Sequence, residues 1–299
     1  MKIKQLDPIT ISQIAAGEVI DRPVSMIKEL IENAIDANAT MITIYTIDGG
    51  KKRIKITDNG HGISKEDLPI AALPHSTSKI SEFDDIYKTL SFGFRGEALS
   101  SICHIAQLTL TSKTQNTQNA YQITAQNTTF SAVAQAAHPQ GTTIDIKYIF
   151  ESLPVRKKFL KSAVTEKSYI IDLIIKFSVL FPEIDFCYID DDKEIINSGG
   201  IPNQLDLIAL FYGQEHLPHL LPVNFNQGPV TINGIISDPS TSFSNKNKQL
   251  FSINKRLIKS SIIQKAVFQS YQDLLPSKRF PLTILDISLP TNQCDVNIH

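Results

Sequence analysis

The stretch IKELIENAIDA, residues 27–37, places a carboxylate, a carboxamide and a second carboxylate at helical spacing. At about 100° per residue, Glu29, Asn33 and Asp36 project from one side of a helix, opposite the apolar residues of the stretch. A carboxylate such as that of Glu29 can orient a water molecule and accept its proton. An amide oxygen such as that of Asn33 can bind Mg²⁺ without adding a negative charge. The pattern also fits the ordinary solvated face of an amphipathic helix, so other residues must decide.

A second candidate segment, TDNGHGI at residues 57–63, follows a predicted strand. Asp58 offers a hydrogen-bond acceptor, and Gly60 and Gly62 allow the backbone to approach a flat ligand closely. Because Asn-Gly is a strong turn dipeptide, the segment taken alone favours a simple turn. The acidic spacing of a calcium-binding loop is absent from it.

The third candidate segment is SFGFRGEALSS, residues 91–101, in which Gly93 and Gly96 precede a helix pattern that begins at Glu97. Free N–H groups at the start of a helix attract anions, so this segment could bind phosphate. A glycine-containing loop capped by a helix is the alternative. The sequence contains no Gly-Lys-Ser, no Gly-Lys-Thr and no kinase signature, so a nucleotide would be bound by another architecture.

Hydrophobic periodicity predicts the elements that position these residues. Pro23 suits a first helical position, and we expect the helix to run to about Ala37, with Asn38 at its end. Residues 41–58 fit a hairpin that turns at Gly49-Gly50. Further strands are expected at 106–112, 120–125 and 142–149, helices at about 165–181 and 260–275, and another hairpin at 185–198. This alternation predicts an α+β fold in which a mixed sheet is layered with helices.

Length and composition restrict the class of protein. The chain has 299 residues, and the segment 198–204 interrupts both periodicities, so we expect two domains, 1–202 and 203–299. A hydrophobic fraction of 42% and a charged fraction of 20% fit a soluble globular protein. The sequence has no signal-peptide pattern and no apolar run of about 18 residues, so no membrane association is expected. Its scattered cysteines argue against a zinc site and fit a reducing cytosol.

In order along the chain, these segments resemble the GHKL ATPases, with Glu-x-x-x-Asn, Asp-x-Gly-x-Gly, a glycine-containing phosphate loop and the Gly-Thr pair of GTTIDI at 141–146. More narrowly, the chain resembles the N-terminal ATPase region of the MutL family of DNA mismatch-repair proteins. The segments behind this resemblance cover essentially the whole chain: QIAAGEVIDRP, KELIENAIDANAT, DNGHGI, HSTSKI, GFRGEAL, LPVRKKFL and CDVNIH. AAGEV and GFRGEAL are distinctive, since a gyrase, a chaperone or a histidine kinase is not expected to carry both.

The resemblance implies a GHKL (Bergerat) two-layer sandwich of mixed sheet and helices over residues 1–202. A smaller α/β domain, similar to the ribosomal-protein-like second domain of GHKL ATPases and incomplete at its C-terminus, is implied over residues 203–299. ATP and Mg²⁺ are the implied cofactors.

The resemblance also implies roles for single residues. Glu29 is expected to be the general base, Asn33 the Mg²⁺ ligand and Asp58 the acceptor for the adenine amine, with Thr143 supporting the Asp58 network. Residues 76–79 and 93–99 are expected to wrap the phosphates as a lid that becomes ordered when ATP binds. The full set of further residues expected to contact the nucleotide is Asp36, Ala37, Asn59, Gly60, Gly62, Ile63, Ser76, Thr77, Ser78, Lys79, Gly93, Phe94, Arg95, Gly96, Glu97, Ala98 and Leu99.

The implied function is that of an ATP-dependent mismatch-repair factor. Mg-ATP binding and slow hydrolysis would order the lid and drive dimerisation of N-terminal regions, with the first twenty or so residues reaching the second protomer. The implied partners are mismatch-recognition proteins, downstream repair proteins, and double- and single-stranded DNA bound without sequence specificity. The expected location is the bacterial cytosol or nucleoid, or the nucleus of a eukaryote.

Two departures from the family pattern affect these expectations. Pro74 stands where bacterial members often carry Arg, which removes a charge and a donor beside the lid. Family members continue past VNIH with a segment whose lysine reaches the γ-phosphate. We therefore expect a chain that ends at His299 to bind Mg-ATP and to hydrolyse it weakly.

Basic residues gather in two stretches. Residues 239–272 contain no acid and hold Lys246, Lys248, Lys255, Arg256, Lys259 and Lys265. Residues 154–167 hold Arg156, Lys157, Lys158, Lys161 and Lys167 against Glu166. Such stretches fit either a surface that follows DNA phosphates or ordinary solubilising side chains. The segment SINKR matches the place where family members line a DNA groove, so Arg256 and Lys255 are the expected DNA contacts there. In the other basic stretch, Lys158 is the expected DNA contact.

An alternative function remains open at this stage. The chain could be a nucleic-acid-binding module in which nucleotide only stabilises a dimer and hydrolysis is vestigial. A chaperone or topoisomerase ATPase would share Glu-x-x-x-Asn, but AAGEV and GFRGEAL disfavour it.

Overall fold

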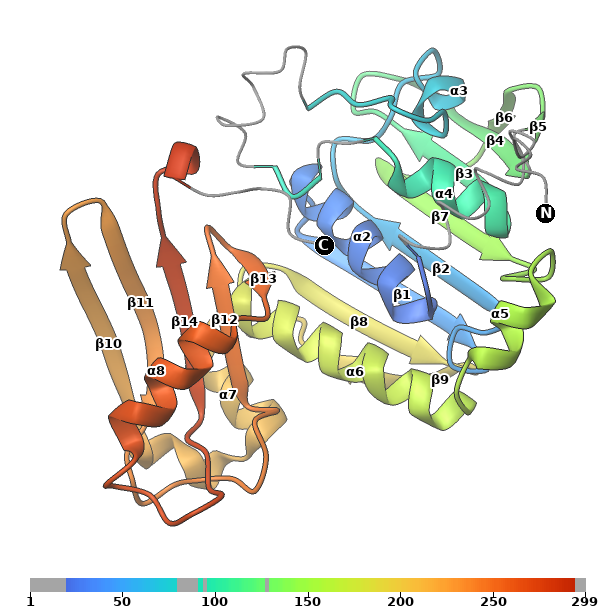
Figure 1. Cartoon of the computed structure of the whole chain (residues 1–299). Coiled ribbons are helices and arrows are strands. Elements are labelled where there is room, and N and C mark those ends of the chain that lie inside the picture. The colour runs from blue at the N-terminus through green and yellow to red at the C-terminus, as the bar shows by residue number, and fades with distance from the viewer. Residues whose placement is uncertain (1–19, 80–90, 94–95, 127–128, 294–299) are drawn as a thin grey trace, which may run out of the picture. The chain divides into compact units, whose positions relative to one another are not determined.

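A computed structural model describes residues 20–79, 91–93, 96–126 and 129–293 (Figure 1). Contacts between residues divide the chain into two units, which meet in the sequence between Pro202 and Asn203. The first unit holds the described residues from 20 to 202, and the second holds those from 203 to 293. No helix in these ranges has the length and apolar content that a membrane span needs.

The first unit is built on a mixed sheet. Among the described residues its strand order is β5-β4-β3-β7-β2-β1-β8-β9, and β6 pairs with β4. Strands β1 and β8 run parallel, whereas β1–β2, β2–β7 and β3–β7 are antiparallel. The strands are β1 (Met41–Ile47), β2 (Arg53–Asp58), β3 (Gln107–Lys113), β4 (Ala120–Gln126), β5 (Thr129–Phe130), β6 (Ala134–Ala136), β7 (Gly141–Lys147), β8 (Asp185–Asp190) and β9 (Lys193–Asn197).

Helices α2 (Pro23–Asp36), α4 (Ala98–Ile105) and α6 (Ala163–Leu180) cover one face of this sheet (Figure 1). Alternate residues of β1 and β2 are buried on one side of their strands, as the period of two requires. The first unit also contains the short helices α3 (Leu68–Ala71) and α5 (Pro154–Phe159). The predicted α+β sandwich of mixed sheet and helices is confirmed.

The predicted local elements around α2 are confirmed. The helix begins at Pro23 and ends at Asp36, and Asn38 takes the left-handed conformation with φ of 57°. The following hairpin turns through Gly49 and Gly50, both with positive φ. These features follow from local sequence, because proline, asparagine and glycine each restrict or permit backbone angles directly.

The described part of the second unit has a five-stranded sheet in the order β10-β11-β14-β12-β13, in which β12 and β14 are parallel. Val267 and Tyr271 of α8 pack on Phe251 of β12. The strands are β10 (Leu220–Gln227), β11 (Val230–Ser237), β12 (Gln249–Ile253), β13 (Arg256–Ile258) and β14 (Thr283–Ser288). The helices are α7 (Gln204–Tyr212) and α8 (Ser261–Tyr271), with short 3₁₀ turns η2 (Gln214–His219) and η3 (Thr291–Gln293).

Sequence periodicity did not predict α5 or α7, and it made α8 too long. No residue of α5 is buried, so that helix has no apolar stripe. The sequence of α7, QLDLIALFY, is apolar on most sides and hides the helical period. Helix α8 ends at Tyr271 instead of near residue 275, and Pro276 follows the turn that begins there.

Candidate functional site

The polar side of α2 carries the predicted catalytic residues at an accessible position. Ile27, Leu30 and Ile31 on the opposite side are at most 2% exposed. The side chain of Glu29 is 26% exposed, and its Oε1 lies 3.7 Å from Nζ of Lys28. Glu29 therefore lies on the polar side of α2 with its side chain partly exposed, where a water molecule can reach it.

The ammonium group of Lys79 lies against the next turn of α2. Its Nζ is 3.0 Å from Oδ1 of Asn33 and 2.5 Å from Oδ2 of Asp36. The side chains of Asp36 and Lys79 are 10% and 21% exposed, so this ion pair is largely shielded from solvent. A cation thus already contacts the amide oxygen that the sequence predicted to bind Mg²⁺. Neutral and charged oxygens at this place fit a hard divalent cation.

Asp36 also holds the segment that precedes α4. Its Oδ1 and Oδ2 accept hydrogen bonds from the N–H of Phe92, at 3.0 and 3.1 Å, and Oδ2 accepts one from Gly93 at 3.5 Å. A Cβ atom on Gly93 would lie 3.4 Å from Nζ of Lys79, so glycine lets this segment approach the ion pair. One carboxylate therefore joins α2, Lys79 and residues 92–93.

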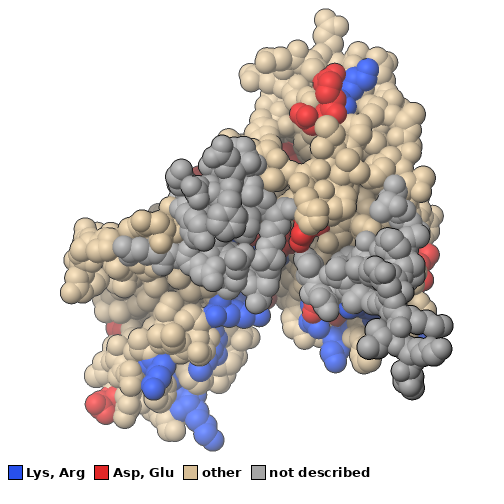
Figure 2. Space-filling view, turned by 45° about the horizontal axis from the view of Figure 1, so that its top comes forward, with Lys and Arg blue, Asp and Glu red and all other residues tan. Residues whose placement is uncertain are grey.

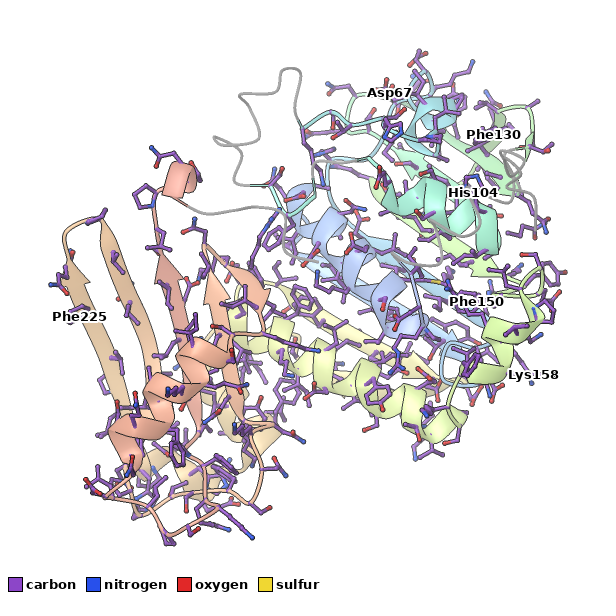
Figure 3. All side chains as sticks on the ribbon, viewed as in Figure 1. Asp67, His104, Phe130, Phe150, Lys158 and Phe225 are labelled. Carbon is purple, nitrogen blue, oxygen red and sulfur yellow. The ribbon has the colours of Figure 1, made fainter. Side chains whose placement is uncertain are left out.

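We expect Asp36→Ala to accelerate amide hydrogen exchange at Phe92 and Gly93 by about tenfold or more. Each N–H would lose a charged acceptor, and such hydrogen bonds contribute about 1.5–3 kcal/mol. The measurement is amide exchange of the nucleotide-free chain, followed residue by residue. Asp67→Ala is the control, because the exposed Asp67, labelled in Figure 3, accepts a hydrogen bond from the hydroxyl of Ser64 instead. Unchanged protection at Phe92 in Asp36→Ala would contradict the assigned contact.

The described ends of the two predicted phosphate loops meet. Gly96 has φ of 62°, and a Cβ atom there would collide with the backbone of Ser76. Nδ1 of His75 lies 3.3 Å from Oε1 of Glu97, the residue that caps α4. The N–H of Lys79 donates to Oγ1 of Thr77 within the first loop. Ser78 is exposed, Ala98 and Leu99 begin α4, and Phe94 and Arg95 lie outside the described residues.

Asp58 lies at the end of β2 and is partly buried. Its Oδ1 accepts a hydrogen bond from the N–H of Gly60 at 2.8 Å. Burial raises the pKa of the Asp58 carboxyl above its ordinary value, and the N–H groups of Gly60 and Thr142 act against that rise. A buried carboxylate with acceptor capacity left over suits recognition of an amine.

The structure gives the glycines after Asp58 a role within the protein. A Cβ atom on Gly60 would lie 2.7 Å from the carbonyl oxygen of Ala37, and one on Gly62 would collide with the carbonyl of Lys113. Gly62 also has φ of 75°. Neighbouring atoms thus fill the Cβ position of both glycines, and close approach of this backbone to a flat ligand stays a prediction.

Two further predicted residues are engaged by the protein itself. Oδ1 of Asn59 accepts hydrogen bonds from the N–H groups of Thr40 and Met41, both at 2.9 Å, and its Nδ2 donates to Oγ1 of Thr40. The N–H of Ile63 donates to Oγ of Ser112 at 2.7 Å. Asn59 therefore ties the end of β2 to the start of β1.

The expected link between Thr143 and Asp58 is corrected by strand register. Asp58 pairs with Thr142 across β2 and β7, and Thr143 pairs with Thr57. Because paired residues share a face and neighbours alternate, Thr143 lies on the opposite face of the sheet from Asp58. There its Oγ1 contacts Oγ1 of Thr57 at 2.8 Å and Nε2 of His138 at 2.7 Å. Thr142 is the residue of this pair that shares the face of Asp58.

Two family models match this chain, one in its N-terminal part and one in its C-terminal part. Residues 22–151 match the family model described as histidine kinase-, DNA gyrase B- and HSP90-like ATPase. Residues 208–299 match the model described as DNA mismatch repair protein, C-terminal domain.

Curated relatives are similar over the whole chain. The DNA mismatch repair protein MutL of Carboxydothermus hydrogenoformans is 41% identical over 299 residues, which are 100% of this chain and 52% of the relative. The MutL protein of Clostridium botulinum is 39% identical over 298 residues, or 44% of its length. The chain thus spans about half the length of the curated relatives that it matches.

Solved structures share the fold. The crystal structure of the N-terminal domain of a DNA repair protein aligns with a TM-score of 0.82 at 27% identity, covering 97% of this chain and 90% of that one. The Aquifex aeolicus MutL ATPase domain complexed with ADP aligns with a TM-score of 0.68 at 23% identity, covering 91% and 93%.

Proposed function

Because this chain belongs to the MutL family of DNA mismatch-repair proteins, in which it corresponds to the N-terminal GHKL ATPase region, we propose that it binds Mg-ATP beside the polar side of α2 and hydrolyses it slowly. The observation that supports this best is the arrangement around Asn33 and Asp36. Their side-chain oxygens, the Lys79 ammonium and the N–H groups of residues 92–93 meet at one end of α2. Cationic and N–H donors gathered beside oxygen ligands suit a phosphate–metal complex.

In the proposed mechanism, Glu29 orients the attacking water and accepts its proton. Its position on α2, one turn from Asn33, puts the base beside the residues that hold the phosphates. Asn33 holds Mg²⁺, which when bound offsets the charge of the phosphates. Asp58 accepts a hydrogen bond from the adenine amine, and Thr142, its partner across β2 and β7, is the threonine on the same face of the sheet.

Lys79 has two partners to exchange in this proposal. Its ammonium is paired with Asp36 and Asn33. A bound nucleotide would offer its phosphates to Lys79, and a bound Mg²⁺ would be held by Asn33, so Lys79 would give up its contacts with α2. The same change frees Asp36 from its ion pair and alters its hold on residues 92–93. Nucleotide contacts thereby move segments on both sides of α2, and this supports dimerisation driven by ATP.

Titration with a non-hydrolysable ATP analogue tests the binding site and the dimer together. With Mg²⁺ present, we expect saturable binding in calorimetry and a doubling of mass in light scattering. Binding without a change of mass would retain the nucleotide site and remove the dimer from the proposal. Absence of binding would remove both.

The proposal includes non-specific DNA binding through basic residues of the second unit. Arg256 is the first residue of β13, after a turn in which Asn254 and Lys255 have positive φ. Nζ of Lys255 lies 3.4 Å from Oδ2 of Asp286, so part of its charge is offset. The face of the second unit drawn in Figure 2 shows more Lys and Arg than Asp and Glu side chains. Lys158, labelled in Figure 3, lies on α5 of the first unit and is exposed.

Arg256→Glu is expected to weaken DNA binding and to reduce the slope of log K against log salt by about one or more, because one phosphate contact is lost. Fluorescence anisotropy with a short duplex at several salt concentrations measures the DNA affinity and its salt slope. The affinity for ATP should stay unchanged. Lys193→Glu makes the same kind of charge change at an exposed site of β9, outside both basic stretches, and serves as the control. Equal salt slopes for Arg256→Glu and the unmodified chain would remove Arg256 from the DNA site.

A further inference from the structure

Strand β10 of the second unit is a long, exposed edge strand without charged side chains. Of its residues, Leu221 and Phe225 are 46% and 49% exposed, and Phe225 lies at the outer side of the sheet (Figure 3). The whole hairpin, residues 220–237, contains no Asp, Glu, Lys, Arg or His. Natural edge strands are usually short, charged or covered, because an open edge can pair with another chain.

The opposite edge of the same sheet carries such protection. Strand β13 has three residues, and Lys255, Arg256 and Lys259 lie in or beside it. Strand β10 has eight residues, and Pro222 is its one residue that interferes with pairing. The two edges of one sheet therefore differ in charge and in length, and only β10 resembles a strand built for pairing.

The backbone groups that β10 leaves open can be assigned from its register with β11. The N–H of Asp238 donates to the carbonyl of His219, and these two residues continue the β10–β11 register. In an antiparallel pair, hydrogen-bonded positions alternate with open ones. The residues whose backbone groups point away from β11 are therefore Leu220, Pro222, Asn224 and Asn226.

The two faces of β10 differ in polarity. Leu221, Val223 and Phe225 share one face, which continues across β11 through Ile236 to the face that α8 covers. Leu220, Pro222, Asn224 and Asn226 share the other face, which is uncharged and mixes apolar with polar residues. A strand that extends this sheet must match an apolar face on one side and an uncharged mixed face on the other.

We propose that β10 pairs antiparallel with β10 of a second copy of this chain, about a two-fold axis perpendicular to the sheet. Such an axis keeps each face on its own side, so the apolar face of one copy continues into the apolar face of the other, and the uncharged mixed face continues into its own counterpart. Two neutral strands also bring no like charges together. The second copy is thus the occupant that satisfies face polarity, charge and hydrogen-bond pattern at once.

The open backbone groups select one register. If Val223 lies opposite Val223 of the second copy, then Leu221 faces Phe225, and Leu220 faces Asn226. Asn224 can donate its N–H to the carbonyl of Pro222, although Pro222 has no N–H to return. This register forms about six interstrand hydrogen bonds, more than registers shifted by two residues. Two five-stranded sheets would then join into one continuous sheet.

Sedimentation velocity without nucleotide and with a metal chelator tests this association separately from ATP-driven dimerisation. The unmodified chain should dimerise as its concentration rises. Val223→Lys, which places two ammonium groups opposite each other, and Asn224→Pro, which removes an outward N–H, should each weaken the dimer at least tenfold. Ile262→Lys adds the same charge at a position of α8 that is 80% exposed, and should dimerise like the unmodified chain. A chain that stays monomeric at every concentration, or a dimer that survives both edge variants, would overturn the proposal.

A disulfide tests the register even if one of these variants fails to fold. In the proposed dimer, Val223 and Val223 of the second copy face each other without sharing backbone hydrogen bonds. The Cβ atoms of such a pair are about 4.5–5.5 Å apart, close enough for a strained disulfide to form. Val223→Cys should therefore form a covalent dimer under mild oxidation, whereas Ile262→Cys should not. The unmodified chain controls for its three native cysteines. Cross-linking of Val223→Cys no faster than that of Ile262→Cys would refute the pairing.

Discussion

Glu29→Gln is expected to lower kcat for ATP hydrolysis by about 10²–10⁴-fold, the usual contribution of a positioned general base. Glutamine keeps the size of the side chain but cannot accept a proton. Nucleotide affinity should change little, because in the proposed mechanism Glu29 acts on the water and does not hold the phosphates. Steady-state phosphate release gives kcat, and calorimetry with a non-hydrolysable analogue gives affinity.

Glu32→Gln is the matched control on the same helix. Oε1 of Glu32 lies 2.8 Å from Nζ of Lys28, and its side chain is 8% exposed, so it is not open to a catalytic water. Its variant should keep most of the turnover. If the unmodified chain and Glu29→Gln release phosphate at the same negligible rate while DNA binding persists, the chain is a nucleic-acid-binding module with vestigial hydrolysis.

Asp58→Asn should reduce ATP affinity by about 100-fold, since the amide can present a donor where the adenine amine needs an acceptor and a buried polar group is left unpaired. The same change should raise the thermal stability of the nucleotide-free chain at pH 7. Burial raises the folded-state pKa of Asp58 above its unfolded value, so the carboxyl's favourable contribution is lost as pH rises through the folded pKa. A neutral amide avoids this loss.

The gain in Tm should therefore shrink as the pH falls toward about 4, where the carboxyl is protonated in the unfolded chain as well. Calorimetry at several pH values gives the Tm difference, and analogue titration gives the affinity. Asp67→Asn, at an exposed carboxylate, is the control for both measurements. Unaltered ATP affinity in Asp58→Asn would exclude Asp58 from the adenine site.

Sequence patterns identified those parts of the site that lie within one element. The spacing of Glu29, Asn33 and Asp36 places them together on α2, because one helix turn brings residues three and four apart onto the same side. Sequence patterns did not reveal that Lys79 lies against Asn33 and Asp36. A contact between residues more than forty positions apart depends on how the chain returns to α2.

The sequence also did not predict the register of strand pairing. Thr142 and Thr143 are adjacent and chemically identical, and a shift of one residue exchanges their faces. Only the pairing of β7 with β2 shows that Thr142 shares the face of Asp58. The surroundings of Gly60 and Gly62 could not be predicted from the sequence either, because their neighbours are backbone atoms of Ala37 and Lys113 from other segments.

By itself, then, the sequence determined the α+β fold class, the helix and hairpin around α2, and the family to which the chain belongs. Backbone restrictions and periodic burial act over a few residues, so local sequence is enough to set them. The tertiary structure decided which cation meets Asn33, which threonine shares a face with Asp58, and which edge of the second sheet is left open. Those features depend on contacts between segments distant in the chain, and local sequence carries no direct record of such contacts.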